Sequence, residues 1–203
     1  INGSTNAVMH LISMGKELGI DIALSEFDTI SKETPAILNI SPIGPYTVDE
    51  LYDYGGVPQI MKQLESLLDT DVLLPTGKTL GEELARVPDA PNDFVRSISN
   101  PVSAEGGMAI MYGSLAPDGA VMRTTLKESI TMDRKFVAHT FSSDEDAFKA
   151  IQAGEIHEGD AIILRYLGPS GAPGMVEVMQ AADALVDFGL ASKVAVITDG
   201  RFS

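Results

Sequence analysis

An arginine, a hydroxyl and a carboxylate stand where two apolar segments of the chain end. Arg201 and Ser203 belong to the sequence DGRFS, which directly follows the apolar run Val194–Thr198, and Glu177 lies downstream of an earlier apolar run. If both runs are parallel strands joined by a crossover helix, their carboxyl ends share one edge of a sheet. The pattern therefore predicts that these side chains lie together around one opening at that edge of the sheet. The alternative is a plain surface turn, which Asp-Gly sequences often form.

A loop rich in glycine and proline, residues 168–174, precedes Glu177. It holds three Gly and two Pro in seven residues, and we expect it to join a buried strand to a helix that begins near Met175. Glycine lets a ligand approach the backbone closely, and loops at the carboxyl ends of strands commonly build active sites. The alternative for Glu177 is a structural role, because a carboxylate in the first turn of a helix is favourable with the helix dipole.

Residues 3–6, GSTN, lead directly into an expected helix. The free amides of a helix start, together with the hydroxyls of Ser4 and Thr5, could hold a carboxylate or a phosphate. The alternative is that these residues only cap the helix.

The sequence TGKT at residues 76–79 resembles the end of a nucleotide-binding P-loop. Such a loop needs a glycine five residues before Gly77, and Val72 stands there. We therefore interpret Gly77 as a turn residue and Thr79 as the cap of the next helix.

The composition excludes several other kinds of site. The chain of 203 residues has no Cys and three His, which excludes a disulfide framework, a thiolate zinc site and an iron–sulfur cluster ligated from within this chain. Its net charge of −15 repels nucleic-acid phosphates and anionic lipid headgroups. No stretch approaches the ~18 apolar residues that a membrane helix needs. We expect a soluble, untargeted, cytoplasmic chain.

The apolar pattern changes period near Asp93, after a segment that contains Pro88 and Pro91. We therefore predict a mixed α/β fold with a domain boundary there, helical over 1–93 and β-rich over 94–203. The expected helices are 6–18, short helices after Ser25 and Thr47, 57–68, 79–87, one after Ser143, and 176–188; the expected strands are 94–98, 108–112, 120–124, 136–141, 161–164 and 194–198.

Six ordered segments together resemble the dihydroxy-acid/6-phosphogluconate dehydratase family over nearly the whole chain. Within the family, the chain resembles the dihydroxy-acid branch at Ala7, because the phosphogluconate branch tends to carry His at this position. The segments are GSTNAVMH at 3–10, GGVPQIMKQL at 55–64, TGKTL at 76–80, NPVSAEGGMAIMYGSLAPDGAV at 100–121, GPSGAPGMVEVM at 168–179 and ITDGRFS at 197–203.

The resemblance implies that residues 1–93 are the tail of an α/β, cluster-binding first domain, and that 94–203 form a barrel-like second domain of the swivelling type. It also implies that the intact protein is a homodimer. Because Ile1 is not an initiator residue and no closing element follows Ser203, we expect this chain to be an internal fragment, inactive on its own.

The implied reaction removes water from a 2,3-dihydroxy acid and gives a 2-keto acid. Residue by residue, Glu177 matches a ligand of Mg²⁺ and Ser203 matches the proposed base, while Ser4, Thr5 and Arg201 are expected to bind substrate. The resemblance implies that the cysteines of an iron–sulfur cluster and the other magnesium ligands lie upstream. The cluster iron would act as a Lewis acid on the departing 3-hydroxyl.

Three interpretations of the function remain open at this point. The leading one is a lyase of branched-chain amino-acid biosynthesis, the route to isoleucine and valine, which dehydrates acids of the 2,3-dihydroxyisovalerate type. The second is the same chemistry on gluconate or another sugar acid. The third is a non-catalytic ligand-binding module that keeps the fold.

Overall fold

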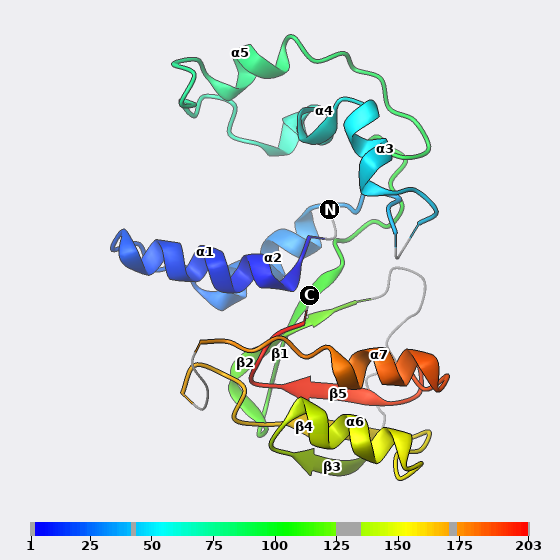
Figure 1. The fold of residues 1–203 in the computed structure, drawn as a ribbon. Coiled ribbons are helices and arrows are strands. Elements are labelled where there is room, and N and C mark those ends of the chain that lie inside the picture. The colour runs from blue at the N-terminus through cyan, green and yellow to red at the C-terminus, as the bar shows by residue number, and fades with distance from the viewer. Residues whose placement is uncertain (1–2, 42–43, 125–134, 171–173, 203) are drawn as a thin grey trace. The chain divides into compact units, whose positions relative to one another are not determined.

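A computed structural model describes residues 3–41, 44–124, 135–170 and 174–202. The chain divides into two compact units, one made of residues 1–3 and 7–130 and the other of residues 4–6 and 131–203. Each contains helices and a small sheet (Figure 1). The mixed α/β fold class predicted from the sequence is confirmed.

The first unit is mainly helical, as its apolar pattern predicts. Its core contains Ile37, Leu38, Ile60, Leu64, Phe94 and Val95, and the ring of Tyr46 lies 5.0 Å from that of Phe94. The helices are α1 (Thr5–Glu17), α2 (Leu24–Glu33), α3 (Val48–Asp53), α4 (Gly56–Gln63), the 3₁₀ helix η1 (Glu65–Leu67) and α5 (Leu80–Leu84).

Of the two capping boxes expected in the first half, at Ser25 and Thr47, the one at Thr47 is present. The Thr47 hydroxyl accepts the N–H of Glu50, and the Glu50 carboxylate accepts the N–H of Thr47 at 2.7 Å. Thr79 caps α5 in the same way. The cap expected at Ser25 is wrong, because α2 already begins at Leu24 and the preceding N–H, of Ala23, donates to the Glu26 carboxylate.

A two-stranded antiparallel sheet follows the helices of the first unit. It consists of β1 (Met108–Gly113) and β2 (Ala116–Arg123). The strand predicted over 94–98 is wrong: only Val95 forms a single bridge, with Leu38, because the side chain of Asn92 accepts the N–H groups of both Phe94 and Val95 and curls the segment into a turn.

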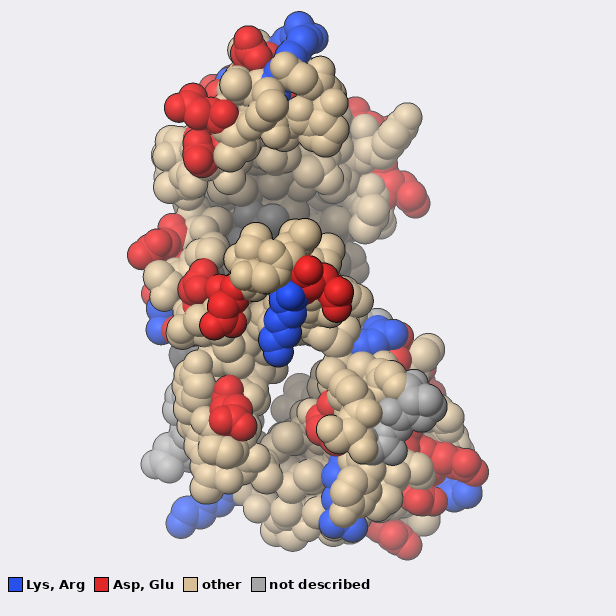
Figure 2. Space-filling view, turned by 90° about the vertical axis from the view of Figure 1, so that its left-hand side faces the viewer, with Lys and Arg blue, Asp and Glu red and all other residues tan. Residues whose placement is uncertain are grey.

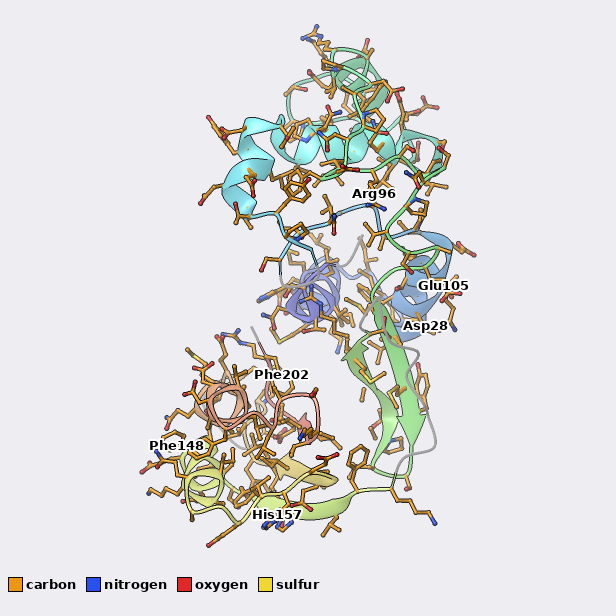
Figure 3. The ribbon with its side chains drawn as sticks, turned by 90° about the vertical axis from the view of Figure 1, so that its right-hand side faces the viewer. Asp28, Arg96, Glu105, Phe148, His157 and Phe202 are labelled. Atoms are coloured by element: carbon orange, nitrogen blue, oxygen red, sulfur yellow. The ribbon has the colours of Figure 1, made fainter. Side chains whose placement is uncertain are left out.

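The second unit is built on a parallel sheet in the order β3-β4-β5, with β3 at Val137–Phe141, β4 at Asp160–Leu164 and β5 at Ala195–Thr198. Helices α6 (Asp144–Gln152) and α7 (Gln180–Asp187) pack side by side against it. The core between sheet and helices is aliphatic, and Phe148 and Phe202 pack against it (Figure 3). Parallel strands joined by helices are the arrangement that the strand–helix–strand pattern predicts.

The five strands of the described residues form no closed barrel, so the barrel-like second domain stays a prediction. None of the helices within the described ranges is long and apolar enough to cross a membrane. Figure 2 shows acidic side chains scattered over one face of the molecule, in keeping with the net charge of −15.

Candidate functional site

Glu177 and Arg201 are paired beyond the carboxyl ends of β4 and β5. The two residues form a parallel β-bridge, in which the Val178 N–H donates to the Arg201 carbonyl at 2.8 Å and the Arg201 N–H donates to the Val176 carbonyl at 3.0 Å. Since β4 and β5 are parallel, Glu177 and the DGRFS segment lie at the same edge of the sheet. The structure therefore brings these two predicted site residues together.

The side chains of this pair are also in contact. The Arg201 Nη1 lies 3.0 Å from the Glu177 Oε2, and the two side chains are 32% and 25% exposed. The Arg201 Nε–H points to the Met175 carbonyl, at 3.4 Å. A carboxylate and a guanidinium thus lie half-buried at this edge of the sheet, held by both backbone and side-chain bonds.

Glu177 does not lie in a helix, contrary to the prediction of a helix over 176–188. The helix α7 begins only at Gln180, and Glu177 is in extended backbone that pairs with Arg201. The backbone bonds of residues 176 and 178 are taken by the neighbouring segment, so they are not free for a helical turn. The alternative explanation of Glu177 as a helix-dipole residue is therefore wrong.

Asp199 is a site residue that the sequence analysis placed only within a motif. Its carboxylate accepts the N–H groups of Tyr166, at 3.1 Å, and Leu167, at 2.9 Å, and so ties the end of β5 to the end of β4. A side chain at Gly168 would meet the Asp199 carbonyl at 2.6 Å, which explains a glycine there.

Tyr166 is the one residue other than glycine with a positive φ, 67°, among the described residues. This left-handed backbone costs a non-glycine residue roughly 1–2 kcal/mol. The Tyr166 ring is more than half exposed, and the Arg165 guanidinium lies 5.0 Å from its centre. A strained, exposed aromatic residue held by Asp199 marks this strand end as a place where backbone conformation is imposed.

Within the described part of the chain, the structure does not connect the other predicted site residues to the Glu177–Arg201 pair. Ser4 and Thr5 stand at the start of α1, where the Ser4 hydroxyl accepts the N–H of Asn6 at 3.2 Å, the bond expected of a cap. The described hydrogen bonds and ion pairs join neither residue to Glu177 or Arg201. Ser203 and part of the glycine-rich loop, residues 171–173, lie outside the described residues.

The TGKT segment forms the turn and the cap expected of it. Gly77 has a φ of 78° and closes a turn in which its N–H donates to the Leu74 carbonyl. The Thr79 hydroxyl accepts the N–H of Glu82 at 3.2 Å. Both residues are thus engaged in local structure.

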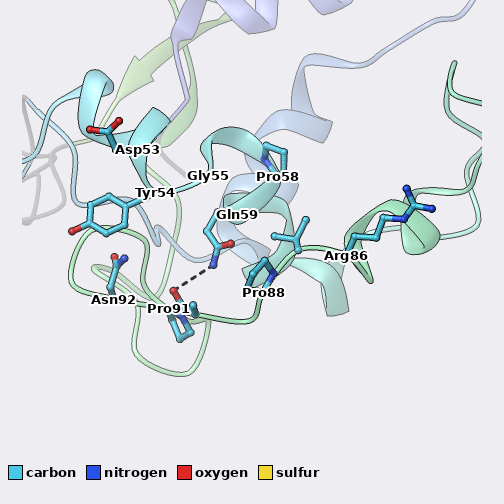
Figure 4. A pocket seen from close by; sticks show the side chains of 11 residues that line it. Asp53, Tyr54, Gly55, Pro58, Gln59, Arg86, Pro88, Pro91 and Asn92 are labelled. Atoms are coloured by element: carbon cyan, nitrogen blue, oxygen red, sulfur yellow. Dashed lines mark hydrogen bonds between the residues drawn. The ribbon is translucent and has the colours of Figure 1, made fainter.

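A separate cavity of about 690 Å³ lies in the first unit (Figure 4). Its wall includes Tyr54, Arg86 and Gln59, whose amide donates to the Ala90 carbonyl at 3.3 Å. The described residues that line it include none of the predicted site residues.

The chemistry of the donors decides which metal groups this chain could hold. Glu177 offers a carboxylate oxygen, the kind of ligand that Mg²⁺ prefers. Within the described ranges, however, no three His, Asp or Glu side chains gather as a metal cluster. The chemistry of Glu177 thus fits a single ligand of Mg²⁺, and the described residues supply no further carboxylate or imidazole cluster around it. A cysteine-ligated iron–sulfur cluster does not fit this chain, which has no Cys.

The combination of an α/β fold, the glycine-rich loop and the Glu177–Arg201 pair is accompanied by two family matches. Residues 1–83 match the family model "Dihydroxy-acid/6-phosphogluconate dehydratase N-terminal", and residues 93–203 match the model "Dihydroxy-acid/6-phosphogluconate dehydratase C-terminal". The chain belongs to this dehydratase family. The boundary near Asp93 itself stays a prediction.

Individual relatives are named dihydroxy-acid dehydratase. The chain is 42% identical over 205 residues to the dihydroxy-acid dehydratase of Aquifex aeolicus (strain VF5). It is 43% identical over 208 residues to that of Saccharolobus islandicus (strain M.14.25 / Kamchatka #1), and 44% over 207 residues to that of Nitratidesulfovibrio vulgaris (strain DSM 19637 / Miyazaki F). Each comparison covers 100% of this chain but only 37% of the relative's length.

Proposed function

We propose that the intact protein is a hydro-lyase that removes water from a 2,3-dihydroxy acid and gives a 2-keto acid. The observation that carries this proposal is the 42–44% identity, over the whole chain, to proteins named dihydroxy-acid dehydratase. The proposed substrate is of the 2,3-dihydroxyisovalerate type, which places the enzyme in the biosynthesis of isoleucine and valine.

Glu177 has the chemistry of a metal ligand in this proposal. Its carboxylate is half-buried and oriented by backbone pairing, which lowers the conformational cost of binding an ion. Bound Mg²⁺ would hold the oxygens of the substrate and acidify the hydrogen on C2. The cysteines of an iron–sulfur cluster would have to come from outside this chain, since it has none.

Arg201, Ser4 and Thr5 bind the substrate in this proposal. The Arg201 guanidinium binds an anionic oxygen, because a half-buried arginine donates charge-assisted hydrogen bonds to carboxylates, as it does here to Glu177. Ser4 and Thr5 provide further hydroxyl groups for the substrate.

The proposed base is Ser203, which removes the C2 proton as the 3-hydroxyl leaves. A free serine hydroxyl is a poor base, so it must be deprotonated next to a cation in order to act. The enol that results tautomerises to the 2-keto acid, gaining a proton at C3 and losing the one on its C2 hydroxyl.

The proposal extends to the cellular location and the assembly of the enzyme. We also propose that the enzyme acts in the cytoplasm and that it assembles as a homodimer. No nucleic acid or membrane takes part in the reaction.

A turnover assay on the intact protein tests the function and its base. The wild type should dehydrate 2,3-dihydroxyisovalerate in preference to gluconate. Because general-base catalysis contributes ~10²–10⁴-fold, Ser203→Ala should lower turnover by at least about a hundredfold while changing substrate affinity far less. Ser192→Ala, at an exposed turn before β5, is the matched control and should leave turnover unchanged.

Two outcomes would contradict the proposal. Preferential dehydration of gluconate would assign the enzyme to sugar-acid substrates. A Ser203→Ala variant within about tenfold of wild-type turnover would show that another group removes the proton, since a lost general base costs more.

A further inference from the structure

Glu177 sits in a short extended segment whose backbone is anchored on both sides. On one side, the bridge to Arg201 holds the backbone of Val176 and Val178. On the other side, the segment enters α7 through Met179. The direction of the Glu177 side chain therefore depends on both anchors, because a carboxylate on extended backbone turns with it.

The second anchor is a side chain from a different helix. Asp144 is the first residue of α6, and its carboxylate reaches across to the start of α7. Its Oδ2 accepts the N–H groups of Met179 and Gln180, each at 2.9 Å, and its Oδ1 accepts that of Ala181, also at 2.9 Å. Three backbone donors thus converge on one carboxylate.

The helix α7 depends on this contact because it has no side-chain cap of its own. Met179 stands at its N-cap position and makes no capping bond with its side chain. The first N–H groups of a helix need acceptors, and a negative charge near them is favourable with the helix dipole. Asp144 satisfies both needs from 35 to 37 residues away in the sequence.

Around this contact the two helices pack closely through small side chains. Ala147 on α6 and Ala181 on α7 are both fully buried in the core of the second unit. Met179 is two residues from Glu177, roughly 7 Å along an extended chain at 3.3 Å per residue. A shift of the α7 start would therefore be transmitted directly to the carboxylate.

We propose that Asp144 is a positioning residue, which fixes the Glu177 carboxylate for metal binding by holding the start of α7. The inference rests on the proposed function, in which Glu177 is a ligand of Mg²⁺. Asp144 does not touch the metal or the substrate. It acts through Glu177 alone.

A double-mutant cycle on the metal-stripped intact protein tests this role, with Mg²⁺ titrated by calorimetry. Residues that support a metal ligand typically contribute 10–100-fold to affinity, so Asp144→Ala should weaken Mg²⁺ binding by about tenfold. Asp144→Asn keeps one acceptor oxygen and should show a smaller loss. In the Glu177→Gln background, Asp144→Ala should cause no further loss, because the ligand that it positions is already gone.

The matched control is Glu145→Gln, which makes the same charge change one residue away. Glu145 is exposed and pairs with Lys149 at 2.7 Å, so this variant should bind Mg²⁺ within about twofold of the wild type, the size expected of a surface ion pair. Circular dichroism confirms that each variant is folded, and Asp144→Asn replaces Asp144→Ala if the latter is not.

The outcomes separate the inference from the function on which it rests. If Glu177→Gln weakens Mg²⁺ binding but the Asp144 variants do not, the inference is overturned and the proposed function stands. Additive losses in the double variant would likewise overturn it, because Asp144 would then act on the fold and not through Glu177. If Glu177→Gln itself leaves the affinity unchanged, both are wrong.

Discussion

Removing the Asp199 carboxylate should loosen the connection between the ends of β4 and β5. In the structure this carboxylate accepts two backbone N–H groups, from Tyr166 and Leu167. Asp199→Ala removes both acceptors and leaves the buried Leu167 amide without its partner. The backbone at Tyr166 then has nothing from Asp199 to hold it in the left-handed conformation.

The magnitude follows from the two bonds and the strain that they offset. Because Asp199 is exposed to solvent, each bond is worth about 1 kcal/mol, for a total of about 2 kcal/mol. This is similar to the roughly 1–2 kcal/mol that a left-handed backbone costs a residue such as Tyr166. In the variant, the ends of β4 and β5 should therefore separate more often than in the wild type.

Hydrogen exchange of the Leu167 amide measures the effect directly. A loss of about 1.4 kcal/mol corresponds to a tenfold change in an equilibrium, so exchange should become at least tenfold faster in Asp199→Ala. Asp187→Ala, at the exposed end of α7, should leave the Leu167 rate unchanged. Unchanged exchange in Asp199→Ala would refute the role of these hydrogen bonds.

Two further predictions concern the first unit. Thr79→Ala removes the hydroxyl that caps α5 and should lower the free energy of unfolding by about 1 kcal/mol in a denaturant titration; an unchanged midpoint would contradict the cap. The hydrogen bonds from Lys32 and from the Ile110 N–H hold the pKa of Asp28 below its ordinary value of 3.8. The folded state thus binds this proton less readily, so the stabilisation by Asp28 is present above pH 3.8 and is lost as the pH falls through the lowered pKa. Thermal unfolding over a pH series should show Asp28→Asn less stable than the wild type near pH 6, with a gap that closes on acidification; a gap independent of pH would contradict this.

Much of the sheet and the pairing at its edge could be predicted from the sequence. The apolar run Ala161–Leu164 forms the central strand β4, because a buried parallel strand is continuously apolar. The meeting of Glu177 with the DGRFS segment followed from the rule that parallel strands end at one edge. Local caps such as Thr47 were equally accessible, since their partners lie three residues away.

The structural contacts of Asp144 and Asp199 were missed because their partners are distant in the sequence. Asp144 and Asp199 accept backbone N–H groups from 32 to 37 residues away, and no local pattern distinguishes such an aspartate from one that is merely exposed. The start of α7 was misplaced for a related reason. The apolar side chains of Val176, Val178 and Met179 suit either a helix or a bridge, and the pairing of Glu177 with Arg201 decides between them.

The central claim is that this chain contributes Glu177 as a ligand to the magnesium site of a dihydroxy-acid dehydratase, and Mg²⁺ titration of Glu177→Gln in the intact protein tests it most directly. The variant keeps the size of the side chain and removes its charge, while Glu155→Gln, at an exposed position after α6, serves as the control. The account predicts that Glu177→Gln weakens Mg²⁺ binding by at least tenfold and leaves iron–sulfur absorbance unchanged, with Glu155→Gln like the wild type. Wild-type Mg²⁺ affinity in Glu177→Gln would contradict it.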